Sequence, residues 1–94
     1  MEFDQLVEVL LGLSINRKKI VKYVHEKNEG ITFRDVKRDL NLEERKAKEF
    51  LYDLYRKKIF HRDFRKSRPY ISLYSISELY KEAVSWCIET NRIL

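Results

Sequence analysis

The hydrophobic period of this chain of 94 residues changes after Lys58, and that change constrains the fold more than any other feature. Up to that point apolar residues recur every three or four positions, the spacing that places them on one side of an α-helix. From residue 59 to residue 76 they alternate with polar residues, a pattern typical of strands with one buried face. A helical pattern returns at Ser77. The sequence therefore predicts an α+β fold that is mainly helical and contains one β-hairpin.

The predicted elements follow one another closely, because two Gly and one Pro leave little material for long irregular loops. Gly30 is expected to take the positive φ angle that ends the second helix, and Asn41 the left-handed turn before the fourth. We expect a single domain over residues 1–94, made of an N-terminal helix (1–13), a core of three helices (17–58, with helices at 17–27, 33–40 and from 43), a hairpin (59–76, with strands at 59–65 and 70–76) and a C-terminal helix (77–94).

The net charge of +5 is unevenly distributed along the chain. Residues 14–76 carry eighteen Lys and Arg against nine Asp and Glu, whereas residues 1–13 carry three acids and no base. A basic centre between acidic, apolar ends indicates a domain whose middle faces a polyanion. A generally charged surface is the alternative interpretation.

Several classes of protein are not indicated by the sequence. Its single cysteine, Cys87, cannot form an internal disulfide. The apolar N-terminal segment is interrupted by acids, so we expect neither a signal peptide nor a membrane span. We therefore expect a cytoplasmic protein, or one in the host cytoplasm if a virus encodes it. The residues form no nucleophile–base pattern, metal-ligand cluster or phosphate loop, so we expect no enzyme, cofactor, metal or small-molecule substrate.

The stretch from Ile31 to Phe60 reads ITFRDVKRDLNLEERKAKEFLYDLYRKKIF. Its apolar register resembles that of the winged helix-turn-helix family of DNA-binding proteins, with Asn41 and Lys58 where the family often has Gly. The segment Leu73–Glu78 is similar to the strand-to-helix junction of MarR-, PadR- and ArsR-type regulators. A charged fraction of 37% and many Lys, Glu, Ile and Tyr residues resemble proteins of hot environments, which suggests an archaeon or an archaeal virus as the source.

The resemblance implies that the helix from Glu43 is a recognition helix that enters the major groove of duplex DNA. Its implied DNA contacts are Arg45, Lys46, Lys48, Glu49 and Tyr52. Glu43 and Glu44 depart from the family pattern, and helix capping is the preferred interpretation of these two acids.

The hairpin, or wing, is the strongest basic segment, because residues 57–68 carry six bases and one acid. Its expected DNA contacts are Arg62, Arg65, Lys66 and Arg68. Charges that protect a sheet edge from aggregation are the alternative interpretation. Further contacts with the DNA backbone are expected from Arg17, Lys18 and Arg34.

The apolar terminal helices indicate a dimer, because they offer more hydrophobic surface than one small core requires. The predicted interface consists of Leu6, Leu10, Val84, Trp86 and Ile88.

Three functions follow from these observations. The first is a transcription regulator that binds duplex DNA as a homodimer, the second is non-specific architectural or replication-associated DNA binding, and the third is a winged-helix protein-interaction module.

Overall fold

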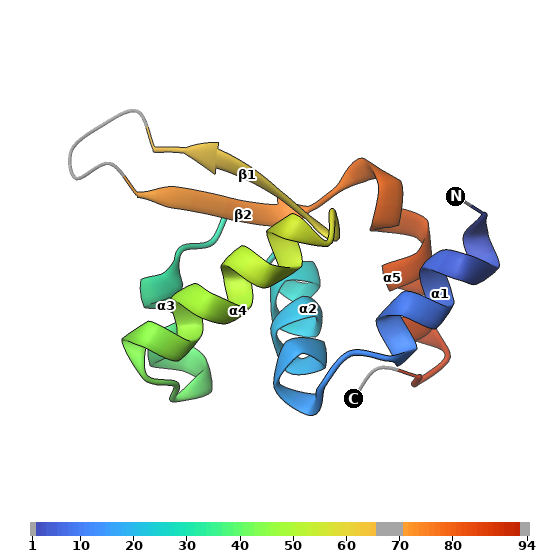
Figure 1. The fold of residues 1–94 in the computed structure, drawn as a ribbon, viewed down its shortest axis with the longest axis horizontal. Coiled ribbons are helices and arrows are strands. Elements are labelled where there is room, and N and C mark those ends of the chain that lie inside the picture. The colour runs from blue at the N-terminus through green and yellow to red at the C-terminus, as the bar shows by residue number, and fades with distance from the viewer. Residues whose placement is uncertain (1, 66–70, 93–94) are drawn as a thin grey trace.

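A computed structural model describes residues 2–65 and 71–92, and it confirms the mainly helical α+β architecture. Figure 1 shows α1 and α5 side by side at one end, α2 and α4 in the middle, and the strands directed away from α1 and α5. Within these residues the elements are α1 (Phe3–Leu11), α2 (Ile15–Lys27), α3 (Phe33–Leu40), α4 (Glu44–Arg56), β1 (Phe60–Phe64), β2 (Ser72–Ile76), a 3-10 turn (Glu78–Tyr80) and α5 (Lys81–Glu89).

One hydrophobic core joins all the helices to the hairpin. The apolar stripe of α4 lies within it, as the three- and four-residue spacing predicted. Burial of this stripe fixes which side of α4 faces solvent. The fully buried side chains include Leu10, Ile20, Val36, Leu51, Leu54, Ile59 and Val84.

The ends of the helices are set by local hydrogen bonds. The Ser14 hydroxyl accepts from the Arg17 amide at 3.3 Å, so α2 begins at Ile15 rather than at residue 17 as predicted. The prediction for Gly30 is wrong. Asn28, with φ of 51°, ends α2 instead, because its amide donates to the Val24 carbonyl immediately after the last helical residue.

The turn between α3 and α4 is confirmed. Asn41 has φ of 53°, and α3 begins with a reciprocal pair of hydrogen bonds between Thr32 and Asp35. This compact turn places the start of α4 directly after α3, as in a helix-turn-helix. Glu43 is the residue before α4, which begins at Glu44.

The two strands form an antiparallel hairpin in which Arg62 pairs with Tyr74 and Phe64 with Ser72. Both strands are shorter than predicted. Arg65 lies just beyond β1, although its amide still donates to the Ile71 carbonyl at 2.9 Å. The turn predicted at 66–69 lies outside the described residues. Ile31 exchanges two backbone hydrogen bonds with Tyr74, which ties the start of α3 to the middle of β2.

The C-terminal helix differs from the prediction at both ends. Ser77 caps a 3-10 turn before α5, and α5 ends at Glu89 instead of continuing to residue 94. Asn91 takes a left-handed conformation with φ of 57°, and the Arg92 amide donates to the Cys87 carbonyl, a pair of features that terminates a helix. In the ranges 2–65 and 71–92 no helix has the length and hydropathy that a membrane span requires.

Candidate nucleic-acid interface

The outward side of α4 presents one continuous stripe of exposed side chains. Arg45, Glu49, Tyr52 and Arg56 follow one another at steps of four, three and four residues, so they lie in one line along the helix. The opposite side is buried in the core. Because α4 is fixed by that burial, the stripe is held at the surface with a defined orientation.

The charges on α4 divide into paired and unpaired groups. Lys48 lies 3.7 Å from Glu44, and Lys46 lies 3.9 Å from Glu49, so these two predicted contacts are partly neutralised on the helix itself. Arg45 forms no ion pair with any residue that the structure describes. It is the predicted contact on α4 that is most available to a ligand.

Arg56 is a candidate that the sequence analysis missed. It is exposed, it continues the stripe one turn beyond Tyr52, and it has no ion pair within residues 2–65 and 71–92. The eleven-residue spacing from Arg45, three helical turns, was the available signal.

The wing brings one arginine against α4 and leaves another exposed. The Arg62 guanidinium carbon lies 4.3 Å from the ring centre of Tyr55 and 5.9 Å from that of Tyr52. Arg65, three residues further along, is exposed. The predicted contacts Lys66 and Arg68 lie outside the described residues.

Of the three predicted backbone contacts, Arg17 has a different role. Its Nε donates to Asp53 at 2.8 Å and its guanidinium carbon lies 4.8 Å from the ring centre of Phe50, so it joins α2 to α4. This ion pair occupies the Arg17 side chain, and its predicted contact with the DNA backbone stays a prediction. Lys18 is half-buried, whereas Arg34 is exposed at the start of α3.

Arg34 and Lys48 approach the same aromatic ring. The Arg34 guanidinium carbon lies 5.7 Å, and the Lys48 ammonium 4.5 Å, from the ring centre of Phe33. The structure therefore brings a cation of α3 next to one of α4. Together with Arg45, they extend the basic surface from one helix to the other.

The predicted dimer interface is largely inside one chain. Leu6, Leu10 and Val84 are buried where α1 packs against α5, so their side chains offer no surface to a second copy. This part of the prediction is corrected, because one chain already uses these apolar positions for its own core. Ile88 is half-buried against the same core.

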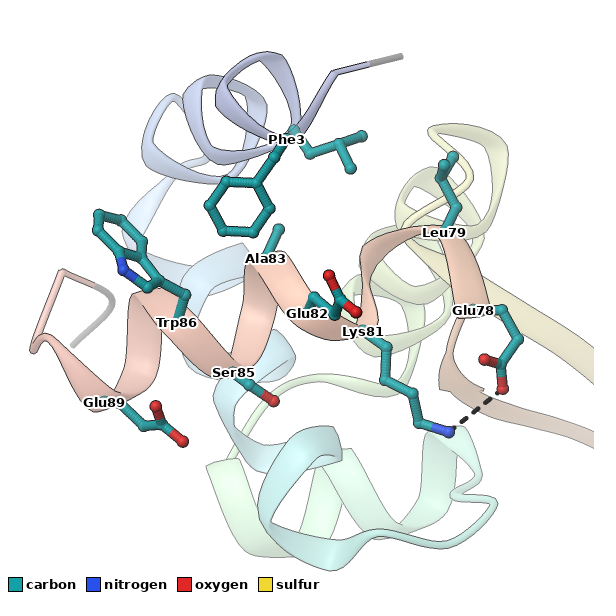
Figure 2. Close-up of a pocket in the computed structure, with 10 residues that line it drawn as sticks. Phe3, Glu78, Leu79, Lys81, Glu82, Ala83, Ser85, Trp86 and Glu89 are labelled. Atoms are coloured by element: carbon teal, nitrogen blue, oxygen red, sulfur yellow. Dashed lines mark hydrogen bonds and ion pairs between the residues drawn. The ribbon is translucent and has the colours of Figure 1, made fainter.

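Trp86 is the predicted interface residue that stays at the surface, with 37% of its area exposed. Figure 2 shows it beside Phe3 at a cleft between α1 and α5, where the two rings meet edge to face with centres 6.0 Å apart. We call this the terminal cleft; its volume is about 660 Å³. Leu79 and the carboxylates Glu82 and Glu89 also line it.

A helix-turn-helix followed by a two-stranded wing defines a winged-helix domain, and this predicted fold is confirmed by a solved structure. That structure is MepR, a transcription regulator of the Staphylococcus aureus multidrug efflux pump MepA. The TM-score is 0.71 over 93% of this chain and 68% of the MepR chain, at 13% sequence identity, so the likeness concerns the fold. The sequence matches no protein-family model and no curated protein.

Proposed function

We propose that this protein is a transcription regulator that binds duplex DNA through α4 and the wing, and that it acts without catalysis. The observation that carries this proposal is the stripe on α4, where Arg45 and Arg56 are exposed without an ion pair in the described part of the chain. The basic wing lies beside this stripe. The winged-helix fold shared with MepR, itself a transcription regulator, supports the proposal.

Different side chains serve different parts of the duplex in this proposal. Arg45 reads a guanine edge, because a guanidinium can donate two hydrogen bonds to its O6 and N7 acceptors. Lys46 and Lys48 exchange their on-helix carboxylates for phosphates. Arg34, Arg56 and Arg65 contact the backbone at the two sides of the groove.

We also propose that the protein binds DNA as a homodimer, with half-sites about one helical turn apart. Phe3, Leu79 and Trp86 are the exposed apolar side chains of the terminal cleft that a second copy would cover. This surface replaces the one predicted from Leu6, Leu10 and Val84.

Selection of bound sequences from a random duplex pool tests the proposed function. We expect enrichment of a palindromic motif, and we expect Arg45→Gln to relax one base position while Lys46→Gln weakens all sequences alike. Salt-sensitive binding without an enriched motif would favour the architectural alternative. An absence of binding at low salt would favour the protein-interaction module.

A further inference from the structure

Arg62 occupies a cage of three aromatic rings that belong to two different elements. Its guanidinium carbon lies 4.3 Å from the ring centre of Tyr55, 5.9 Å from that of Tyr52 and 5.5 Å from that of Phe64. Each distance is within the range of about 6 Å over which a cation is attracted to an aromatic face. The cage therefore connects β1, which carries Arg62 and Phe64, to α4, which carries the two tyrosines.

The register of the hairpin places Arg62 and Phe64 on one side of the sheet, since residues two apart in a strand point the same way. That side faces α4, because Arg62 approaches both tyrosines of the helix. Tyr52 and Tyr55 are three residues apart on α4, and their ring centres are 6.1 Å apart. Strand and helix thus each supply a pair of side chains to the contact.

The outer members of the cage remain accessible. Phe64 is 58% and Tyr52 48% exposed, whereas Arg62 is half-buried beneath them. A half-buried guanidinium with three rings within about 6 Å is less available to a phosphate than the exposed guanidinium of Arg65. The two wing arginines therefore have different surroundings although they are three residues apart.

We propose that Arg62 is a positioning residue that locks the wing to α4, so that helix and wing meet the duplex as one rigid unit. This proposal rests on the proposed function, because the unit that Arg62 orders is the DNA-binding surface. It changes the predicted role of Arg62 from a contact with DNA to a contact within the protein.

The test compares duplex affinity over a series of salt concentrations for Arg62→Gln, Tyr55→Leu, the double variant and Arg65→Gln. We expect Arg62→Gln to weaken binding about five- to thirtyfold at every salt concentration. The salt slope, which is the slope of the logarithm of affinity against the logarithm of salt concentration, should not change, since no phosphate contact is lost. Tyr55→Leu should do the same although it removes no charge. The double variant should be no weaker than either single variant.

Two variants serve as controls. Arg65→Gln should lower the salt slope by about one unit, as the loss of one phosphate contact requires. Tyr55→Phe keeps the ring and should bind like the unmodified protein.

Amide hydrogen exchange without DNA tests the cage directly. We expect the amides of β1 to lose protection in Arg62→Gln and Tyr55→Leu but not in Arg65→Gln.

The outcomes separate this proposal from the proposed function. The proposal would be overturned if the salt slope of Arg62→Gln fell by about one unit while Tyr55→Leu bound with the affinity of the unmodified protein. That result would show that Arg62 contacts phosphate. Unchanged β1 protection in both variants would overturn the cage itself. Failure of the unmodified protein to bind any duplex would overturn the proposed function instead.

Discussion

Arg17 of α2 and Asp53 of α4, which are 36 residues apart in the sequence, form an ion pair of 2.8 Å that links the two helices. Asp53 also accepts a hydrogen bond from Lys57 at 2.8 Å. The hydrogen bond from Lys57 is the largest cause that lowers the pKa of the Asp53 carboxyl, burial opposes it, and the hydrogen bond from Arg17 lowers the pKa further. Arg17 further donates to the Ser14 hydroxyl at 3.1 Å. The junction of α2 and α4 is thus fixed by a small polar network at the edge of the core.

Arg17→Gln should lower the free energy of unfolding by about 1 kcal/mol, because a partly exposed ion pair and one stacking contact are lost. Its salt slope for duplex binding should not change. The neighbouring variant Lys18→Gln should show the reverse behaviour, with unchanged stability and a slope reduced by about one unit. Thermal unfolding measures the stability of each variant, and anisotropy titrations measure its salt slope for duplex binding. An equal decrease in the salt slope of both variants would contradict this division of roles.

Tyr23 should make the protein sensitive to alkaline pH. Burial first, and its hydrogen bond to Asp39 second, raise the pKa of Tyr23 to about 12 from the ordinary 10.0. The unfolded chain therefore loses this proton at lower pH than the folded chain does. The contribution of Tyr23 to the free energy of unfolding is fully present below pH 10 and decreases as the pH rises toward 12. Tyr23→Phe lacks this titration, and denaturant unfolding should show a smaller decline for it over that range. Parallel declines in both proteins would disprove the coupling.

Lys58 carries a backbone strain that glycine would relieve. Its φ is 65°, and it ends α4 with hydrogen bonds from its own amide to the Tyr55 carbonyl and from the Ile59 amide to the Leu54 carbonyl. Lys58→Gly should therefore raise the free energy of unfolding by about 1 kcal/mol. Arg56→Gly, within the helix, should lower it by a similar amount. Thermal unfolding of both variants checks this prediction, which fails if Lys58→Gly is also destabilising.

Trp86→Glu should dissociate the proposed homodimer, because it places a charge in the terminal cleft beside Glu82 and Glu89. Ile15→Glu is the matched control, since Ile15 is 69% exposed at the start of α2 and does not line that cleft. Sedimentation at micromolar concentration should show a dimer for the unmodified protein and the control, and a monomer for Trp86→Glu. A monomeric unmodified protein would remove the dimer from the account.

The sequence alone was sufficient where structure depends on neighbouring residues. The stripe of α4 and the left-handed Asn41 both follow from short-range spacing and local hydrogen bonds. The prediction for Gly30 failed because Asn28 is also suited to ending a helix, and Asn28 directly follows the last helical residue.

Long-range pairing explains what the spacing of residues in the sequence could not show. Arg17 and Arg62 look like free cations in the sequence, because Asp53 and Tyr55 become their partners only when distant elements pack. The same reason hid the burial of Leu6, Leu10 and Val84. An apolar stripe at a chain end predicts that something covers it, but the stripe does not show whether the cover is the chain itself or a second copy.

The most direct test of DNA binding by α4 and the wing is the salt dependence of duplex affinity in two charge-matched variants. Arg65→Gln removes a cation of the wing. Arg92→Gln removes one at the opposite end, where the Arg92 guanidinium carbon lies 5.1 Å from the ring centre of Trp86. We expect affinity to fall steeply as the salt concentration rises, Arg65→Gln to reduce this slope by about one unit, and Arg92→Gln to leave it unchanged. Equal slopes for the two variants, or no binding at low salt, would contradict it.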